Sequence, residues 1–247
     1  MTLEGRIAVV TGASEGIGRG LAIGLAEAGA DVILASRRLD VLEEVRSDIT
    51  GRGGEADIME LDVTDLDSIR VAHHSLADRG LDILVNNAAV SVNRDAWEIS
   101  EDDWKAVMDT GPKGVFFCSQ ILGSVMRDRG YGKIINLSST LSRGVVPGAS
   151  VYATSKAAIS HLTRALATEW ASSGVRVNAL APASTMTPSR AAGMTPEREA
   201  NLEARIPLGR LGTIEDLVPA AVFLAGPDSD FITGQTLYVD GGWTARS

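Results

Sequence analysis

Seven short apolar segments alternate with longer amphipathic ones, and this alternation constrains the fold more than any other feature of the sequence. Strand patterns alternating with helical patterns predict parallel strands joined by helical crossovers. We therefore expect one α/β domain over residues 1–247, with a doubly wound parallel seven-stranded sheet and helices on both faces. The expected strands cover 6–10, 31–36, 56–63, 81–87, 133–139, 175–182 and 236–242; the expected helices cover 39–49, 66–77, 101–127, 152–172 and 214–225, with a first helix starting near residue 16.

The net charge of −9 argues against nucleic acid, an anionic membrane or a strongly acidic protein as partner, because the long-range field repels each of them. The only cysteine, Cys118, lies in the apolar run GVFFCSQ and is expected to be a small buried side chain. An apolar strand begins by Arg6, so no signal peptide is expected before it, and no apolar stretch approaches the roughly 18 residues of a membrane span. These features predict a cytoplasmic protein with a small-molecule partner.

The longest stretch without a predicted helix or strand covers 183–212 and contains Pro188, Pro196 and Pro207. A loop of this length in a compact domain usually has a function. We expect it to act as a substrate loop; the alternative is an exposed insertion.

A glycine-rich turn, TGASEGIG, follows the first strand and precedes the first helix. Gly12 permits the tight turn, while Gly16 and Gly18 allow backbone and helix to approach closely. The helix start then offers free N–H groups and a positive dipole to a pyrophosphate. In this context the turn predicts a Rossmann-type dinucleotide site.

The second strand ends in Ser36, Arg37 and Arg38, where an enzyme that prefers NAD commonly has an acidic residue. Guanidinium groups can bind a 2′-phosphate by charge-assisted hydrogen bonds, whereas a carboxylate would repel it. This favours NADP(H) as cofactor and leaves NAD(H) possible. Glu15 in the glycine turn weakens the prediction, and the two arginines could also be solvated charges of the next helix.

Two further segments are expected at the ligand edge of the sheet. Asp62, at the predicted end of the third strand, could accept a hydrogen bond from the adenine amino group, or could instead cap a helix. The run NNAAV, residues 86–90, follows the fourth strand, and its small residues allow a flat ligand to approach the backbone.

The run VYATSK places Tyr152 and Lys156 four residues apart at the start of a predicted helix. These positions share one helix face, so the ammonium can favour ionisation of the phenol. Ser139 lies 13 residues before Tyr152, at the end of the fifth predicted strand. Its hydroxyl and the phenol can therefore converge on one substrate oxygen.

Together these motifs resemble the short-chain dehydrogenase/reductase family, in its single-domain branch of about 250 residues. The resemblance runs from TGASEGIG through LDV, NNAA, INLSS, YATSK and VNALAP to TGQTLYVDGG. It implies that Tyr152 is the general acid in carbonyl reduction and the base in alcohol oxidation. Lys156 would lower the pKa of Tyr152 and bind the nicotinamide ribose, and Ser139 would hydrogen-bond the substrate oxygen.

The cofactor would contact residues of the glycine turn, the ends of the second to fourth strands and the segment after the sixth. Asn87 and residues 182–187 would flank the nicotinamide. The full set of expected cofactor contacts is Gly12, Ser14, Gly16, Ile17, Gly18, Ser36, Arg37, Arg38, Asp62, Val63, Asn87, Ala88, Tyr152, Lys156, Pro182, Thr185 and Thr187.

Three positions depart from the family pattern. Gly111, in DTGPKGVFF, replaces the usual asparagine that supports a water relay to the lysine; our hypothesis is that Gly111 and Pro112 preserve the local helix break, so that a backbone carbonyl still holds the water. Ala89 and Ala183 each replace a glycine and add a methyl group near the cofactor.

Two further function classes compete with an oxidoreductase. One is a nucleotide-binding regulatory protein that has lost turnover, and the other is a methyltransferase, which has no need of a paired Tyr152 and Lys156. The substrate stays open among a sugar acid, a polyol, a ketone and a 3-oxoacyl thioester. The pocket is expected to use Ser91, Val92, Leu141, Ser142, Val146 and residues 183–207.

The family resemblance also implies a homotetramer, or a dimer, in which the helices at 101–127 and 152–172 pair between subunits. No metal site is expected. His73 and His74 are adjacent on a helix and point in different directions, and His161 stands alone.

Overall fold

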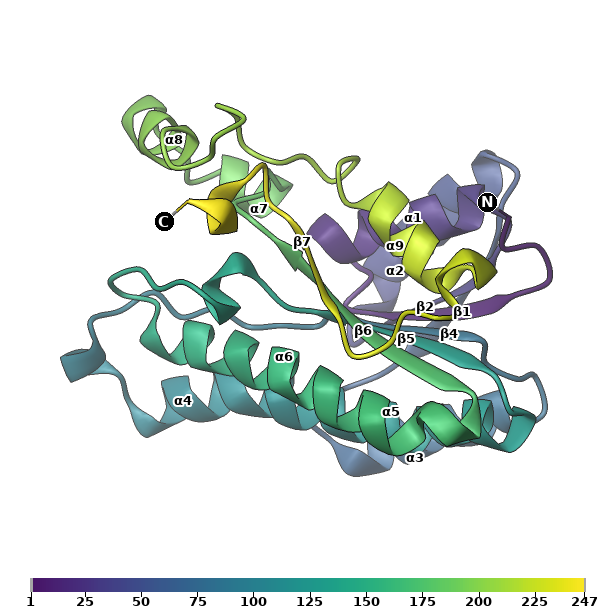
Figure 1. Cartoon of the computed structure of the whole chain (residues 1–247). Coiled ribbons are helices and arrows are strands. Elements are labelled where there is room, and N and C mark those ends of the chain that lie inside the picture. The colour runs from purple at the N-terminus through teal and green to yellow at the C-terminus, as the bar shows by residue number, and fades with distance from the viewer. Residues whose placement is uncertain (1, 247) are drawn as a thin grey trace.

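The computed structural model describes residues 2–246 and alternates strands with helices along its length (Figure 1). The strands are β1 (Ile7–Thr11), β2 (Asp31–Ser36), β3 (Glu55–Glu60), β4 (Ile83–Asn86), β5 (Gly132–Leu137), β6 (Val175–Pro182) and β7 (Thr236–Val239). The helices are α1 (Gly16–Glu27), α2 (Leu39–Gly51), α3 (Leu66–Ala77), α4 (Glu101–Met108), α5 (Gly114–Arg129), α6 (Ser150–Trp170), α7 (Pro188–Ala191), α8 (Pro196–Glu203) and α9 (Val218–Ala225).

All seven strands form one parallel sheet in the order β3-β2-β1-β4-β5-β6-β7. The strand order reverses between β1 and β4, where Val9 lies in register with Leu84 on one side and with Ile33 on the other. The predicted doubly wound sheet is therefore confirmed. In such sheets a ligand binds beyond the carboxyl ends of the strands at the reversal point.

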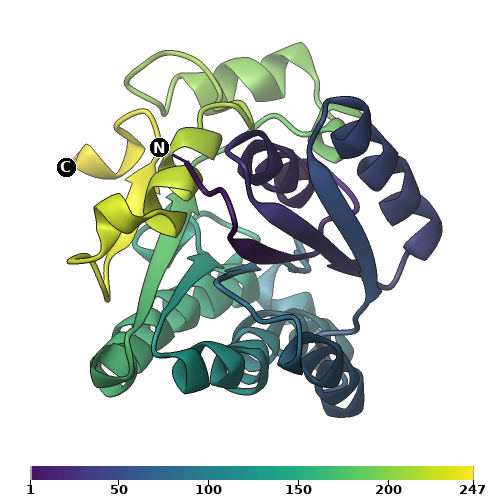
Figure 2. The same cartoon turned by 90° about the vertical axis from the view of Figure 1, so that its right-hand side faces the viewer.

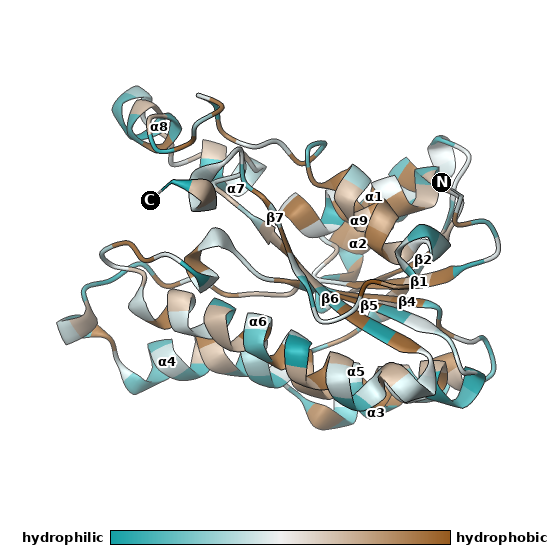
Figure 3. Cartoon of the chain, in the orientation of Figure 1, coloured by the Kyte–Doolittle hydropathy of each residue, from teal (hydrophilic) through white to brown (hydrophobic). Residues whose placement is uncertain are grey.

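Helices cover both faces of the sheet (Figures 1 and 2). Helices α1, α2 and α9 pack on one face, and α3, α5 and α6 pack on the other. Neighbouring residues of a strand point to opposite faces, so Val10 is buried in the first layer and Val9 in the second. This is why the strands are mainly brown in Figure 3 and read as continuous apolar runs.

The helix predicted over 101–127 is broken in the structure. Helix α4 ends at Met108, a π-helical turn covers Asp109–Lys113, and α5 begins at Gly114. Gly111 has ψ −106°, outside the helical range, and Pro112 follows it inside the turn. Because proline has no N–H and disfavours helical geometry in the residue before it, the break occurs where this pair stands. The break itself, expected from Gly111 and Pro112, is thus present.

The stretch 183–212 is not the irregular loop that its prolines suggested. It contains α7 and α8, and each begins with a proline at its first helical position. Thr187 and Thr195 cap these helices, since their hydroxyl groups accept hydrogen bonds from the backbone N–H of Arg190 and Arg198. The prolines therefore start helices here instead of excluding them.

Smaller differences from the expected boundaries concern three strands and one helix. Strand β5 ends at Leu137 and not at residue 139, and β7 ends at Val239 and not at residue 242. Strand β3 ends at Glu60, so Asp62 and Val63 lie just beyond it, and α9 begins at Val218 instead of residue 214. Cys118 is fully buried as predicted, and burial raises the pKa of its thiol to about 12. Among residues 2–246, none of the helices combines the length and the apolar character needed to cross a membrane.

Candidate active site

The glycine turn after β1 has no room for side chains at its critical positions. Gly12 has φ +64°, and a Cβ there would lie 2.9 Å from Ala88 Cα. A Cβ on Gly18 would lie 2.2 Å from the carbonyl oxygen of Gly12. The Asn87 side chain fastens the turn to β4, because its Nδ2 donates to the carbonyl oxygens of Thr11 at 3.0 Å and Gly12 at 3.1 Å. The turn is therefore a rigid cradle of bare backbone at the reversal point of the sheet, which fits a pyrophosphate.

Arg38 lies beside this turn. Its guanidinium donates to Ser14 Oγ at 2.7 Å and forms an ion pair with Glu15 at 3.0 Å. Its backbone N–H donates to Ser36 Oγ at 3.0 Å. Glu15, which weakened the sequence prediction, thus forms an ion pair with an arginine next to the turn.

Arg37 points elsewhere, toward Asp62, with 3.6 Å between guanidinium and carboxylate. The other oxygen of Asp62 accepts hydrogen bonds from the backbone N–H of Thr64 at 2.9 Å and from its hydroxyl at 2.7 Å. Asp65, not Asp62, caps α3 by accepting from the N–H of Asp67 at 2.9 Å. Asp62 therefore stabilises a local turn at the sheet edge and keeps one oxygen facing Arg37.

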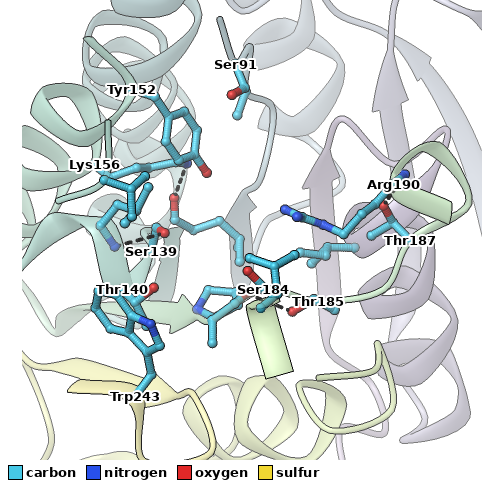
Figure 4. A pocket seen from close by; sticks show the side chains of 18 of the residues that line it. Ser91, Ser139, Thr140, Tyr152, Lys156, Ser184, Thr185, Thr187, Arg190 and Trp243 are labelled. Atoms are coloured by element: carbon cyan, nitrogen blue, oxygen red, sulfur yellow. Dashed lines mark hydrogen bonds between the residues drawn. The ribbon is translucent and has the colours of Figure 1, made fainter. Parts of the chain in front are cut away.

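Ser139, Tyr152 and Lys156 meet in one cavity of about 550 Å3 (Figure 4). Ser139 follows β5 and caps a short 3-10 turn, where its Oγ accepts from the N–H of Leu141 at 3.1 Å. Tyr152 lies in the first turn of α6, and Lys156 lies one turn further along. The 3-10 turn follows the carboxyl end of β5, and α6 begins after it, so all three residues lie at the ligand edge of the sheet.

Three effects act on the pKa of the Tyr152 phenol. Burial raises its pKa, whereas interaction with the Ser139 hydroxyl and the positive charge of Arg190 both lower it. Burial has the largest effect, so the pKa lies above its ordinary value of about 10. In this state the phenol keeps its proton at neutral pH and can act as an acid.

Lys156 is 4% exposed, and its ammonium donates to the carbonyl oxygen of Leu137 at 2.7 Å. Burial lowers the pKa of Lys156 to about 8. Its Nζ lies 5.5 Å from the centre of the Tyr152 ring. The lowering of the Tyr152 pKa expected from Lys156 is not seen here, because the ammonium is directed at Leu137; it stays a prediction for the cofactor-bound protein.

The cavity joins only part of the predicted set. The predicted residues that line it are Ile17, Asn87, Ser139, Tyr152, Lys156, Pro182, Thr185 and Thr187. The others lie outside the lining, on or near the glycine turn and the ends of β2 to β4: Gly12, Ser14, Gly16, Gly18, Ser36, Arg37, Arg38, Asp62, Val63 and Ala88. This division suits a long ligand that runs from the β2 end to the cavity.

The predicted substrate residues Ser91, Leu141 and Val146 line the cavity, whereas Val92 and Ser142 do not. The Ser142 hydroxyl instead lies 3.2 Å from the Tyr238 hydroxyl, because β7 runs past this turn. Ala89 and Ala183, the two added methyl groups, both line the cavity without filling it.

Sequence reasoning did not single out four lining side chains: Arg190, Arg198, Arg205 and Trp243. The arginines fall inside 183–212, and their repetition within a predicted substrate loop was a usable signal. Trp243 offered none, since its place depends on packing against Gly144, where a Cβ would come within 2.3 Å of the indole ring.

The comparison with known proteins agrees with this geometry. A family model described as enoyl-(acyl carrier protein) reductase matches residues 12–244. Gluconate 5-dehydrogenase from Gluconobacter oxydans (strain 621H) is 40% identical over 246 residues, 98% of this chain and 96% of that protein. This chain belongs to the short-chain dehydrogenase/reductase family.

Further members of the short-chain dehydrogenase/reductase family show the same full-length match. The 2-dehydro-3-deoxy-D-gluconate 5-dehydrogenase of Escherichia coli (strain K12) is 40% identical over 252 residues, 99% of this chain and 98% of that protein. The crystal structure of a gluconate 5-dehydrogenase from Burkholderia cenocepacia J2315, in complex with NADP and tartrate, has a TM-score of 0.95 at 38% identity and covers 100% of this chain and 98% of that chain. The prediction of an NAD(P)(H)-dependent oxidoreductase is confirmed at the level of the family, and the regulatory alternative gains no support.

Proposed function

We propose that this protein interconverts a carbonyl and a secondary alcohol with NADP(H) as cofactor. The observation that carries the proposal is the convergence of Ser139, Tyr152 and Lys156 on one cavity. A neutral phenol whose proton is held at neutral pH is suited to donate that proton to a carbonyl oxygen.

The residues have separate roles in this reaction. Ser139 hydrogen-bonds the substrate oxygen, and Tyr152 donates a proton to that oxygen in reduction or removes it in oxidation. Lys156 binds the cofactor ribose and supports the ionised phenol. The bound nicotinamide supplies the hydride to the carbonyl carbon or accepts it from the alcohol carbon.

The cofactor would extend from Arg38 across the glycine turn into the cavity. Arg38, which already faces Ser14 on the turn, would bind the 2′-phosphate, and this favours NADP(H) over NAD(H). Asn87 and residues 182–187 would flank the nicotinamide. NADP in the Burkholderia cenocepacia structure supports the same preference.

The proposal includes a small-molecule substrate, a homotetramer and a cytoplasmic location. The relatives named for gluconate and its dehydro-deoxy derivative support a sugar acid among the candidate substrates. A polyol, a ketone and a 3-oxoacyl thioester remain the alternatives. The single cysteine is buried, which suits a compartment where disulfides are rare.

The test is turnover followed by absorbance of the reduced cofactor. Purified protein is assayed with NADPH and NADH against ketones, oxo acids and 3-oxoacyl thioesters, and with NADP and NAD against D-gluconate and polyols. We expect faster turnover with the phosphorylated cofactor. Tyr152→Phe should lose about 100- to 10,000-fold in kcat, because this is the contribution of proton transfer by a positioned side chain.

The control is Tyr131→Phe. The Tyr131 hydroxyl is buried without a hydrogen-bond partner and precedes β5, at the opposite end of that strand from Ser139. This variant should keep wild-type turnover. Equal activity of Tyr152→Phe and wild type would refute the mechanism.

A further inference from the structure

The charge of the cavity is opposite to that of the protein. The chain has 32 acidic residues and 23 lysines and arginines, for a net charge of −9. The cavity is nevertheless lined by Lys156, Arg190, Arg198 and Arg205, and no carboxylate belongs to its lining as described for residues 2–246. The acidic residues of α8, Glu197, Glu199 and Glu203, are not part of this lining either. A local cationic site in an acidic protein favours an anionic ligand.

Arg190 is the cation best placed to bind such a ligand. It lies across the cavity from Tyr152 (Figure 4), and its charge acts directly on that phenol. Its backbone N–H donates to Thr187 Oγ at 3.2 Å, which fixes its position in α7. Arg190 therefore projects from an ordered turn and not from a free loop.

The guanidinium of Arg190 is half-buried, and within the described residues it has neither an ion-pair partner nor a side-chain hydrogen bond. Burial and the neighbouring charge of Arg198 both lower its pKa, with burial the larger cause. An unpaired charge removed from water is costly, and a bound anion offsets that cost. The planar fork of a guanidinium matches a carboxylate in bidentate geometry.

The other two arginines reinforce the positive field. Arg198 is exposed, and its guanidinium donates to the carbonyl oxygen of Gly193 at 3.4 Å. Arg205 lies over the ring of Trp243 at 5.8 Å. Neither has an ion pair among the residues that the structure describes, so both leave their charge available to the cavity.

Hydroxyl groups also line the cavity that contains Tyr152 and Arg190. Ser91, Ser184 and Ser189 can each donate and accept hydrogen bonds there. Such a lining suits a substrate that carries several hydroxyl groups besides its charged end. A purely aliphatic ketone would leave these groups without partners.

We propose that the substrate is a polyhydroxy carboxylate, bound through its carboxylate by Arg190 while its reacting carbon faces Ser139 and Tyr152. This inference rests on the proposed oxidoreductase function and specifies its substrate class. Arg190 is then a substrate-binding residue that distinguishes acids from neutral polyols and ketones.

The test compares D-gluconate with two neutral probes of the same chain, D-gluconamide and D-glucitol, in wild type, Arg190→Gln and Arg190→Lys. For wild type we expect kcat/KM at least tenfold higher for the acid than for either neutral probe. In Arg190→Gln the KM for the acid should rise by about 10- to 100-fold, as expected for loss of a charge-assisted bidentate contact. The KM values for the neutral probes should change little. In Arg190→Lys the KM for the acid should lie between those of wild type and Arg190→Gln, because lysine keeps the charge without the planar fork.

Arg70→Gln is the matched control, since Arg70 is an exposed arginine on α3 outside the cavity lining. NADPH binding, followed by tryptophan fluorescence, should be unchanged in all the variants. Equal kcat/KM for acid and neutral probes, or an Arg190→Gln effect of the same size on all three, would overturn the inference while leaving the oxidoreductase function intact.

Direct binding separates the two proposals if none of the probes turns over. Calorimetric titration of D-gluconate and D-glucitol into Tyr152→Phe saturated with NADP reports on the carboxylate site without turnover. Preferential binding of the acid that disappears in Tyr152→Phe/Arg190→Gln supports the inference. Absence of that preference refutes it.

Discussion

At the residue scale, Glu15 limits how strongly its neighbour Arg38 can favour NADPH over NADH. Both side chains are largely exposed, at 63% and 50%, and lie 3.0 Å apart beside the glycine turn. An exposed pair of this kind contributes at most about 1 kcal/mol. A 2′-phosphate that uses Arg38 has to compete with the carboxylate of Glu15 and is repelled by it.

Glu15→Gln should therefore raise the preference for NADPH. We expect the ratio of kcat/KM for NADPH to that for NADH to rise about two- to fivefold, since the lost repulsion is of the order of an exposed ion pair. Arg38→Gln should lower the same ratio by at least tenfold. Glu27→Gln is the control, because Glu27 pairs with the distant Arg52. A fall in the ratio for Glu15→Gln would show that Glu15 helps to hold Arg38 in place.

Lys156 makes stability depend on pH. Its folded-state pKa of about 8 lies below the ordinary value of 10.5, because burial penalises the ammonium. Between these values the unfolded chain binds a proton that the folded protein does not, so stability rises with pH in this window. Below pH 8 the buried charge costs roughly 3 kcal/mol.

Lys156→Met should accordingly be more stable than the cofactor-free wild type at pH 7, by about 1 to 2 kcal/mol once the lost hydrogen bond to Leu137 is subtracted. The advantage should vanish by about pH 10. Urea unfolding at pH 7 and pH 10 measures this difference in stability. The control is Lys113→Met, because Lys113 is an exposed lysine that pairs with Asp109. An advantage that grows with pH would contradict the assignment of the low pKa.

At the scale of elements, the break between α4 and α5 is built by two residues. Gly111 leaves the helical conformation, and Pro112 removes the N–H that would continue the hydrogen-bond ladder. A Cβ on Gly111 would lie 3.6 Å from Ser155 Cβ, an ordinary contact next to Lys156. The break therefore does not depend on the asparagine that the family usually has here.

Gly111→Asn should change kcat by less than about threefold, since the Cβ is accommodated and Pro112 maintains the break. The measurements are kcat, its pH profile and its solvent isotope effect in both proteins. A large rate gain in Gly111→Asn would show that the natural glycine impairs the proton relay, and our hypothesis of a backbone carbonyl that holds the water would fail.

At the scale of the whole molecule, apolar surface remains on the helix layer expected to pair between subunits. Trp104 is 45% exposed on α4, although it is a large side chain on a helix that also contacts α6. A single exposed apolar side chain is common on protein surfaces and is not by itself evidence of an interface. Trp104 matters here because it lies on a helix that is expected to pair between subunits. This surface fits the homotetramer expected from the family resemblance.

Light scattering should give a mass of about four times the 25.9 kDa of one chain. Trp104→Glu should lower that mass, because a carboxylate placed in an apolar interface is costly. Val71→Glu, at an exposed position of α3, should leave it unchanged. A monomeric wild type would refute the tetramer, and a Trp104→Glu tetramer would remove α4 from its interface.

The sequence by itself determined the sheet, the glycine turn and the meeting of Ser139, Tyr152 and Lys156 in one cavity. These depend on local patterns: apolar runs of strand length, the short spacing of TGASEGIG, and the one-turn spacing of Tyr152 and Lys156. Each of these patterns spans only a few residues. The residues then meet because the carboxyl ends of neighbouring parallel strands lie at the same edge of the sheet. Ser139 could be predicted for the same reason, since it lies just beyond β5, the last strand before α6.

Only the tertiary structure decided how the charges are used. Arg38 pairs with Glu15 while Arg37 faces Asp62, although the two arginines are adjacent in sequence. Arg190 reaches the cavity because α7 lies over the ligand edge across from Tyr152, and Trp243 lines the same cavity from the last turn of the chain. The strength and direction of a charge depend on burial and on partners distant in sequence, and these exist only once the chain has packed.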